Sequence, residues 1–313
     1  MENEIIVVDN GSTDKTTSII AEYAAKHSDK IKLIKLNRNY GPGAARNIGA
    51  QAAKHDILFF LDADMVFPPD FILKMAKHIL EGKTVSTAHG EEIIRNVDNP
   101  WVKAQGQLKK NIPKHTSEII RAIRKDVFLS YGGFDPSLNY HDDRTFHYKT
   151  GIKAEVVPDA VCYHNNPDTA AEILRRNYWI GRTFIAVTIQ EHGLRGLATV
   201  AKTLTLRMLD LTALPLLITY IALRWMGVSN PLQDILLLAP ALLFTLSTAK
   251  MKILKASTPL ESIKLRLFYA PAYRVLRAAG LIAGVAASLV KGLKWSAGIH
   301  SIEQPPNQAP PKQ

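Results

Sequence analysis

Two aspartates, Asp62 and Asp64, directly follow an unbroken apolar run at residues 57–61. Carboxylates two residues apart can hold a hard divalent cation, which can in turn hold the phosphates of a nucleotide. Ligands of open α/β sheets bind beyond the carboxyl ends of the strands, where these two side chains are expected. The alternative is that both acids only cap the turn through Pro68 and Pro69 into the next helix.

A second candidate group lies at residues 41–47, where Gly41 and Gly43 precede a predicted helix that carries Arg46 in its first turn. Glycines let the backbone approach a phosphate, and the N-terminus of a helix favours an anion. Arg46 would then add a cation at the same edge of the sheet. The alternative is an ordinary loop with a solvated arginine.

A third group combines Asp142 and Asp143, at the start of a predicted helix, with His164 at the end of a predicted strand. Aspartates at a helix N-terminus are stabilised by the helix dipole alone. One of them could instead act as a general base that takes a proton from an acceptor hydroxyl. His164 could complete a metal site with Asp64, although a single histidine is more often structural.

The elements that must position these residues alternate between strand and helix patterns up to about residue 180, which predicts an α/β fold with a mostly parallel sheet and flanking helices. A further strand pair is expected at 154–157 and 160–164, after a helix that carries Phe146 and Lys149. The other predicted strands are 4–9, 32–36, 57–61 and 84–90, and the other predicted helices are one running to about residue 27, 44–53 and 70–80.

Composition limits the partners of this 313-residue chain. It has 39 Lys and Arg residues against 28 Asp and Glu residues, a formal net charge of +11, which favours an anionic partner. Nucleic acid is the least favoured such partner, because the basic residues gather around apolar segments. The single cysteine, Cys162, excludes an intrachain disulfide and a thiolate zinc framework, and is expected to be a buried apolar residue. The acidic start of the chain does not resemble a signal peptide.

Three apolar stretches, 211–223, 235–249 and 278–290, follow the α/β part. With their flanks they approach the ~20 residues that cross a bilayer, so we expect two to three membrane helices within 207–295. The link 227–233 has no basic residue, whereas 250–277 carries seven against one acid, which places the latter segment in the cytoplasm. The alternative is a buried helical hairpin of a soluble protein.

This pattern predicts a protein of the cell membrane, multi-pass or hairpin-anchored, whose catalytic domain is cytoplasmic. The domain is expected at 1–185, an amphipathic interfacial linker at 186–206, and a disordered Pro- and Gln-rich tail at 296–313. Four further side chains cluster on a predicted helix and suit a phosphate or lipid headgroup, or an ordinary basic membrane-facing surface. They are Arg175, Arg176, Trp179 and Arg182.

Over residues 4–185 these motifs resemble the family-2 glycosyltransferases, which have the GT-A fold. Residues 4–14 are similar to the family's VVDDGSTD pattern, which implies that Asp9 contacts the nucleotide base, with Asn10 in place of a second aspartate. Residues 39–49 are similar to its N-x-G…ARN-x-G element, which implies that Arg46 lies near the nucleotide. Asp62 and Asp64 fall at its D-x-D, which implies Asp62 near the ribose and Asp64 on a Mg²⁺ or Mn²⁺ ion that bridges the diphosphate.

Two later segments extend the resemblance. Residues 132–135 and 142–149 are similar to the family's GGFDE…ED-x-D-L-x-x-R, which implies that Asp143 is the catalytic base, or Asp142 if the register shifts by one. Residues 157–164 are similar to its P-D-A-x-x-x-H strand, which implies His164 near the metal. The family normally begins with another, central strand and a P-T-Y-N-like turn before the element at Glu4. The chain is therefore expected to be a fragment, to have a misplaced start or to be a degenerate member, with an exposed edge in its sheet.

The resemblance implies a metal-dependent inverting glycosyltransferase. The donor would be a nucleoside-diphosphate sugar, and the acceptor a hydroxyl of a lipid-linked compound or a glycan. The metal and Arg46 would neutralise the leaving diphosphate while Asp143 deprotonates the acceptor. The alternatives are a polyprenyl-phosphate sugar synthase, a non-catalytic membrane subunit that retains the fold, and a nucleotidyltransferase.

Overall fold

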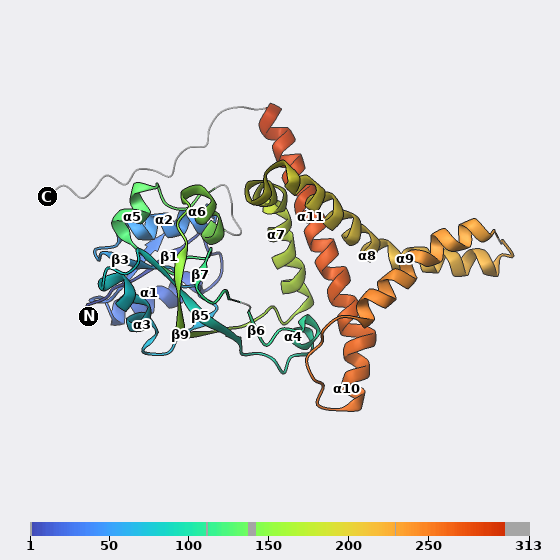
Figure 1. Ribbon diagram of the computed structural model, residues 1–313, viewed down its shortest axis with the longest axis horizontal. Helices are drawn as coiled ribbons and strands as arrows, with labels where there is room; N and C mark the ends of the chain where they lie inside the picture. The colour runs from blue at the N-terminus through green and yellow to red at the C-terminus, as the bar shows by residue number, and fades with distance from the viewer. Residues whose placement is uncertain (1, 111, 137–141, 229, 298–313) are drawn as a thin grey trace.

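The computed structural model describes residues 2–110, 112–136, 142–228 and 230–297, without the side chains of Lys110, residues 142–145 and residues 291–297 (Figure 1). An α/β domain occupies one side of the molecule and a group of long helices the other. The C-terminal residues of the predicted tail, 298–313, lie outside the described residues.

The first two strands form a small parallel sheet of their own. β1 (Ile5–Asp9) pairs with β2 (Ile31–Lys35), and α1 (Thr16–Lys26) connects them. α2 (Pro42–Ala52) packs on β1, where a Cβ atom added to Gly49 would lie 3.3 Å from the Val8 side chain, and it also reaches the main core through Ala50. Among the described strands this pair has no ladder to the larger sheet.

The larger sheet has the strand order β3 (Ile57–Phe59), β8 (Ala122–Arg124), β5 (Ser86–Ile94), β9 (Ala154–His164) and β4 (Met65–Val66). The short strands β6 (Lys109–Lys110) and β7 (Thr116–Ser117) pair with β5 and β9. Of these pairings only β5 with β9 is parallel. The predicted α/β class is confirmed, but the sheet is mixed rather than mostly parallel. The chain between β5 and β8 is a short helix at residues 100–105, two short strands and loops, and it lets β8 run back antiparallel to β5.

β9 is one continuous strand, so the predicted strand pair at 154–157 and 160–164 is wrong. The exposed residues Pro158 and Asp159 lie at an irregularity in the ladder, where His89 pairs with Val157 but Glu91 pairs with Val161. A bulge absorbs the extra residues and lets the strand continue on the same partner.

Two apolar clusters hold the α/β domain together. The first is built from aromatic rings of β3's C-terminal end, α5 (Lys125–Ser130), the following turn and α6 (Asp142–Thr150), with centroids 4.8–5.7 Å apart. These rings are Phe60, Phe128, Phe134 and Phe146. The second cluster lies under α3 (Phe71–Leu80) and includes Phe71, Met75 and Cys162. Cys162 is therefore a buried apolar residue, as predicted.

The helical region starts at α7 (Ala170–His192), and a short 3₁₀ turn, η1 (Gly193–Arg195), leads into α8 (Gly196–Trp225). α9 (Pro231–Ala249) forms a hairpin with α8, and α10 (Pro259–Lys264) leads through a π-helical turn, η2 (Leu265–Tyr269), into α11 (Ala270–Ala297). Segments within 170–225, 231–249 and 259–290 are long and apolar enough to cross a membrane. The range 186–206 lies at the end of α7, in η1 and at the start of α8.

Helices α7 and α11 lie side by side, so close together that glycines are needed at their contacts (Figure 1). A Cβ atom added to Gly284 would lie 2.0 Å from the Tyr178 carbonyl oxygen, and one added to Gly181 would lie 2.2 Å from that of Leu281. Small residues of this kind let two apolar helices pack through their backbones. The two helices therefore form the close-packed centre of the helical region.

The α/β domain is attached to the helices through α4 (Pro100–Gln105). The buried Lys103 Nζ donates to Glu261 Oε1 of α10 at 2.6 Å, and the Lys103 carbonyl accepts from the Leu254 N–H at 3.0 Å. The Trp101 ring lies edge-on to Tyr269, with centroids 5.0 Å apart. The α/β domain is thus held at a defined position beside the apolar helices.

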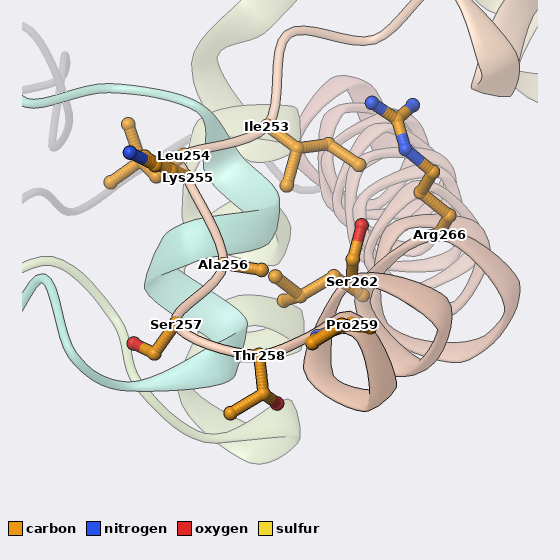
Figure 2. Close-up of a pocket in the computed structure, with 10 residues that line it drawn as sticks. Ile253, Leu254, Lys255, Ala256, Ser257, Thr258, Pro259, Ser262 and Arg266 are labelled. Carbon is orange, nitrogen blue, oxygen red and sulfur yellow. The ribbon is translucent and has the colours of Figure 1, made fainter.

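The loop between α9 and α10 encloses a cavity of about 400 Å³ (Figure 2). Its polar lining includes Ser257, Thr258 and Ser262, with Arg266 at its edge. It contains none of the predicted site residues.

Candidate functional site

A cavity of about 870 Å³ lies between the larger sheet and α7, and it holds most of the predicted site residues. One wall comes from the loops after β3 and β9 and from the start of α2. The facing wall comes from α7. The lining includes Arg46, Asp62, Asp64, His164, Arg175 and Arg176.

Asp62 is clamped between two arginines. Arg46 Nη2 donates to Asp62 Oδ1 at 2.6 Å, and Arg121 Nη1 donates to Oδ2 at 2.7 Å. Burial raises the pKa of Asp62, but the two guanidinium charges more than offset burial and lower this pKa to about 2. Asp62 is therefore a carboxylate at any physiological pH, with each oxygen already bound to an arginine.

Asp64 is oriented differently, because its side chain is 60% exposed and reaches the cavity. Its Oδ2 atom lies 3.2 Å from Nε2 of His164, and this hydrogen bond lowers the pKa of Asp64 below its ordinary value. The β4–β9 ladder creates the contact, since Met65 pairs with His164 and so brings residue 64 beside the end of β9. The structure thus brings together the two residues that the sequence proposed as metal ligands.

The donor set of Asp64 and His164 fits a divalent cation. An oxygen and an imidazole nitrogen converge at the cavity, which suits Mn²⁺ and, less well, the oxygen-seeking Mg²⁺. Asp62 is the poorer ligand of the two acids, because both of its oxygens accept from arginines. The geometry separates the acids into an arginine-bound one and a cavity-facing one.

Asp9 is buried at the end of β1 and caps its own turn. Its Oδ1 atom accepts from the Ser12 N–H at 2.9 Å and its Oδ2 atom accepts from the Thr17 hydroxyl. These hydrogen bonds, from Ser12 first and Thr17 next, lower the pKa of Asp9. Asp9 is described, but it is not one of the residues that line the cavity. Its predicted contact with a base stays a prediction.

The predicted catalytic pair begins α6, whose first residue is Asp142. The helix start is therefore as predicted. The side chains of Asp142 and Asp143 lie outside the described residues, so the choice of base stays a prediction.

Three site residues were missed by sequence reasoning, namely His89, Glu92 and Arg121, all of which line the cavity. Their common signal is a polar or charged residue inside a buried strand pattern, such as Arg121 between Ile120 and Ala122. The side chains of His89, Glu92 and Cys162 also offer ligand atoms within 4.8 Å of one another. A buried charge in a strand costs free energy unless it is paired, and it therefore marks a site worth inspecting.

The α7 wall contributes Arg175, Arg176 and Trp179, which share one helix as predicted. Arg182 lies over the Trp179 ring, 5.2 Å from its centroid. The cavity therefore has cations on the side that faces the apolar helices as well as on the side of the sheet.

Comparisons with known proteins agree with the sequence motifs. Residues 1–134 match the family model described as Glycosyl transferase family 2. The undecaprenyl-phosphate 4-deoxy-4-formamido-L-arabinose transferase of Aeromonas hydrophila is 32% identical over 133 residues, 40% of this chain and 40% of that protein. The protein of the same name from Pectobacterium carotovorum is 38% identical over 150 residues, 46% of this chain and 43% of that protein. The chain thus spans 40% to 43% of the length of these relatives.

Among solved structures, the mannosyltransferase PcManGT from Pyrobaculum calidifontis, in complex with GDP-Man and Mn²⁺, matches with a TM-score of 0.49 and 20% identity, over 92% of this chain and 78% of that chain. The motif resemblance, the matching family model and the curated relatives lead to one conclusion: the chain carries a glycosyl transferase family 2 domain at residues 1–134.

Proposed function

We propose that this protein is a membrane-associated glycosyltransferase that moves a sugar from a nucleoside-diphosphate donor to an acceptor carried by a membrane lipid. The observation that carries the proposal is the cavity with two unlike walls. One wall holds Arg46 and Asp64 from the α/β domain, and the other holds Arg175 and Arg176 on the helix that leads into the apolar segments. The relatives' names, which specify undecaprenyl phosphate, support such an acceptor.

For the donor, Asp64 and His164 would hold Mn²⁺ or Mg²⁺, and Arg46, which binds Asp62, lines the same cavity. The bound cation supplies positive charge that neutralises the leaving diphosphate. Asp62 holds the Arg46 and Arg121 guanidinium groups in place, so that their charge is preorganised before the donor binds. Asp9 would contact the base of the nucleotide.

For the acceptor, Asp143, or Asp142 in the alternative register, would take the proton of an attacking hydroxyl. Direct displacement at the anomeric carbon then inverts its configuration. A lipid phosphate is the second candidate acceptor, and Arg175 and Arg176 favour it specifically, because two cations on the membrane side of the cavity suit a phosphate. An already ionised phosphate has less need of a base.

The location follows from the same charges. We place the α/β domain on the cytoplasmic side of the cell membrane, with α8 and α9 as an out-and-back hairpin. The basic segment at residues 250–277 supports this orientation. Labelling of a single cysteine introduced at the α8–α9 link, from outside intact cells, tests it.

The transfer test uses the full chain in lipid nanodiscs with radiolabelled UDP- and GDP-sugars, and with undecaprenyl phosphate or a glycolipid extract as acceptor. We expect label in the lipid fraction with Mn²⁺ or Mg²⁺ and none with a chelator. The variants Arg175→Gln and Arg176→Gln should weaken transfer to the lipid phosphate more than hydrolysis of the donor. Absence of both transfer and hydrolysis with every donor would instead support the non-catalytic subunit.

A further inference from the structure

A row of four side chains runs from the cavity into the sheet, in the order Asp64, His164, Glu92 and His89. His164 Nε2 lies 3.2 Å from Asp64 Oδ2, and His164 Nδ1 lies 3.8 Å from Glu92 Oε1. The other Glu92 oxygen, Oε2, lies 3.4 Å from His89 Nε2. Glu92 and His89 have no part in the function proposed above.

The pairing of β5 with β9 builds this row. Glu92 is opposite Cys162 and Ile94 is opposite His164, so Glu92 and His164 are diagonal neighbours on one face. His89, three residues before Glu92, would face the other side of a regular strand. The ladder shifts between His89 and Glu91, and both His89 and Glu92 line the cavity.

Gly90 permits that shift. A Cβ atom added there would lie 2.5 Å from the carbonyl oxygen of Pro158, because the bulged backbone of β9 comes that close. A side chain at position 90 would therefore push the two strands apart. The arrangement of His89 and Glu92 depends on a local feature that only glycine allows.

The burial of the Glu92 carboxylate costs free energy. Its side chain is only 3% exposed, and a buried carboxylate is unfavourable unless donors or positive charge face it. The imidazole rings of His89 and His164 each face one of its two oxygens and can supply N–H groups. The buried Nδ1 atom of His164 is the nitrogen that faces Glu92, whereas Nε2 is the nitrogen that faces Asp64 and the cavity.

We propose that Glu92 is a positioning residue for His164. When a divalent cation takes the place of the Nε2 proton that His164 donates to Asp64, Glu92 keeps the other ring proton on Nδ1, so that the Nε2 lone pair is presented beside Asp64 to the cation. An outer carboxylate of this kind fixes the tautomer and the ring orientation of a ligating histidine. At 3.8 Å the carboxylate orients the ring by charge attraction. His89 holds the second oxygen of Glu92. The inference rests on the proposed role of Asp64 and His164 in metal binding.

The first test measures Mn²⁺ affinity by titration calorimetry on the full chain in nanodiscs, without donor. Glu92→Ala is expected to weaken Mn²⁺ binding by about 10- to 100-fold, as the loss of an outer-shell partner does. Glu92→Gln should weaken it less, since the partial negative charge of the amide oxygen still faces Nδ1–H. The matched control is Glu91→Gln, because Glu91 is the adjacent residue, is 32% exposed and pairs with Lys109 at 2.6 Å. Its affinity should equal that of the wild type.

The second readout is the ¹⁴N modulation that a directly bound imidazole gives in pulsed EPR of Mn²⁺. We expect it in the wild type and in Glu91→Gln, weakened in Glu92→Gln and absent in His164→Ala. A purely structural loss would change the melting temperature without removing this signal from the metal that remains bound. If Glu92→Ala does not fold, Glu92→Gln carries the test.

The outcomes separate the two proposals. Wild-type affinity and nitrogen modulation in both Glu92 variants would overturn the positioning role and leave the metal site intact. Mn²⁺ binding that is absent from the wild type, or insensitive to Asp64→Ala, would overturn the metal site and the positioning role together. Mn²⁺ or Zn²⁺ binding that survives Asp64→Ala but is lost in Cys162→Ser would make Glu92 a ligand of a separate site and also overturn the positioning role.

Discussion

The same trio of side chains, one aspartate between two arginines, occurs in both halves of the molecule. In the α/β domain Asp62 lies between Arg46 and Arg121. Among the helices Asp210 of α8 binds Arg207 one turn away, at 3.0 Å, and Arg274 of α11. The Asp62 side chain is 29% exposed, whereas that of Asp210 is only 3% exposed.

The surroundings decide what each trio does. The Asp62 trio borders the cavity, so its arginines can act on a ligand. In the Asp210 trio, Arg274 also donates to the Phe244 carbonyl at 2.9 Å and to Thr248 Oγ1 at 2.8 Å, both on α9. It therefore ties three apolar helices together. The same charge arrangement therefore leaves its arginines open to a ligand where solvent reaches them and joins helices where solvent does not.

The largest expected effect is on stability, from Asp210→Asn. This change leaves two arginines near apolar helices without their counter-charge, which typically costs about 3 to 5 kcal/mol. We expect a marked fall in the free energy of unfolding, measured by SDS titration in mixed micelles. The control is Asp234→Asn, because Asp234 lies 3.8 Å from Arg224 at the start of α9 and is partly exposed. Equal destabilisation by both variants would contradict the special role of Asp210.

Asp64→Ala should give the next largest effect, on transfer rather than on stability. Loss of a metal ligand removes charge stabilisation of several kcal/mol, so we expect at least about 100-fold slower transfer. The melting temperature should change little, since Asp64 is mostly exposed. Asp70→Ala is the control, because Asp70 is an exposed acid that pairs with Lys74 on α3. Transfer at more than a tenth of the wild-type rate would count against the site.

The Asp62 trio should make stability depend on pH. The folded pKa of about 2 is below the ordinary 3.8, so the ionised carboxylate stabilises the fold above about pH 4, and this contribution is lost as the pH falls towards 2. The shift corresponds to about 2 kcal/mol. The difference in unfolding free energy between the wild type and Asp62→Asn should therefore shrink between pH 4 and pH 2. A difference that stays constant over this range would show that the arginines do not hold the charge.

The smallest effect is expected for an exposed pair, Lys26 with Glu22 on α1. Solvent screens such pairs and the two side chains lose entropy when they meet, so Lys26→Ala should not measurably change the melting temperature. Thermal unfolding followed by circular dichroism checks this. A clear decrease would mean that lower exposure is not what distinguishes the Asp62 and Asp210 trios from an exposed ion pair.

Much of the site could be predicted from local patterns. The run before Asp62 identified a strand end, and the helical spacing of Arg175, Arg176 and Trp179 placed them on one helix. Arg121 and Glu92 were missed because their roles depend on strand pairing, which no local pattern specifies. The strand pair at 154–164 was predicted wrongly for the same reason. Pro158 indicates a break when read alone, but pairing with β5 carries the strand through it.

Two properties were determined by the sequence alone, namely that strands and helices alternate before a region of long apolar helices, and that two acids follow the third strand. Periodicity and composition are local, so a chain carries them before it folds. Only the tertiary structure decided which of the two acids binds arginines and which one faces His164. Asp62 meets Arg46 and Arg121 from 16 and 59 residues away, while the β4–β9 ladder turns Asp64 towards His164. The physical reason is that a carboxylate's role depends on the charges within a few ångströms of it, and chain folding sets those distances.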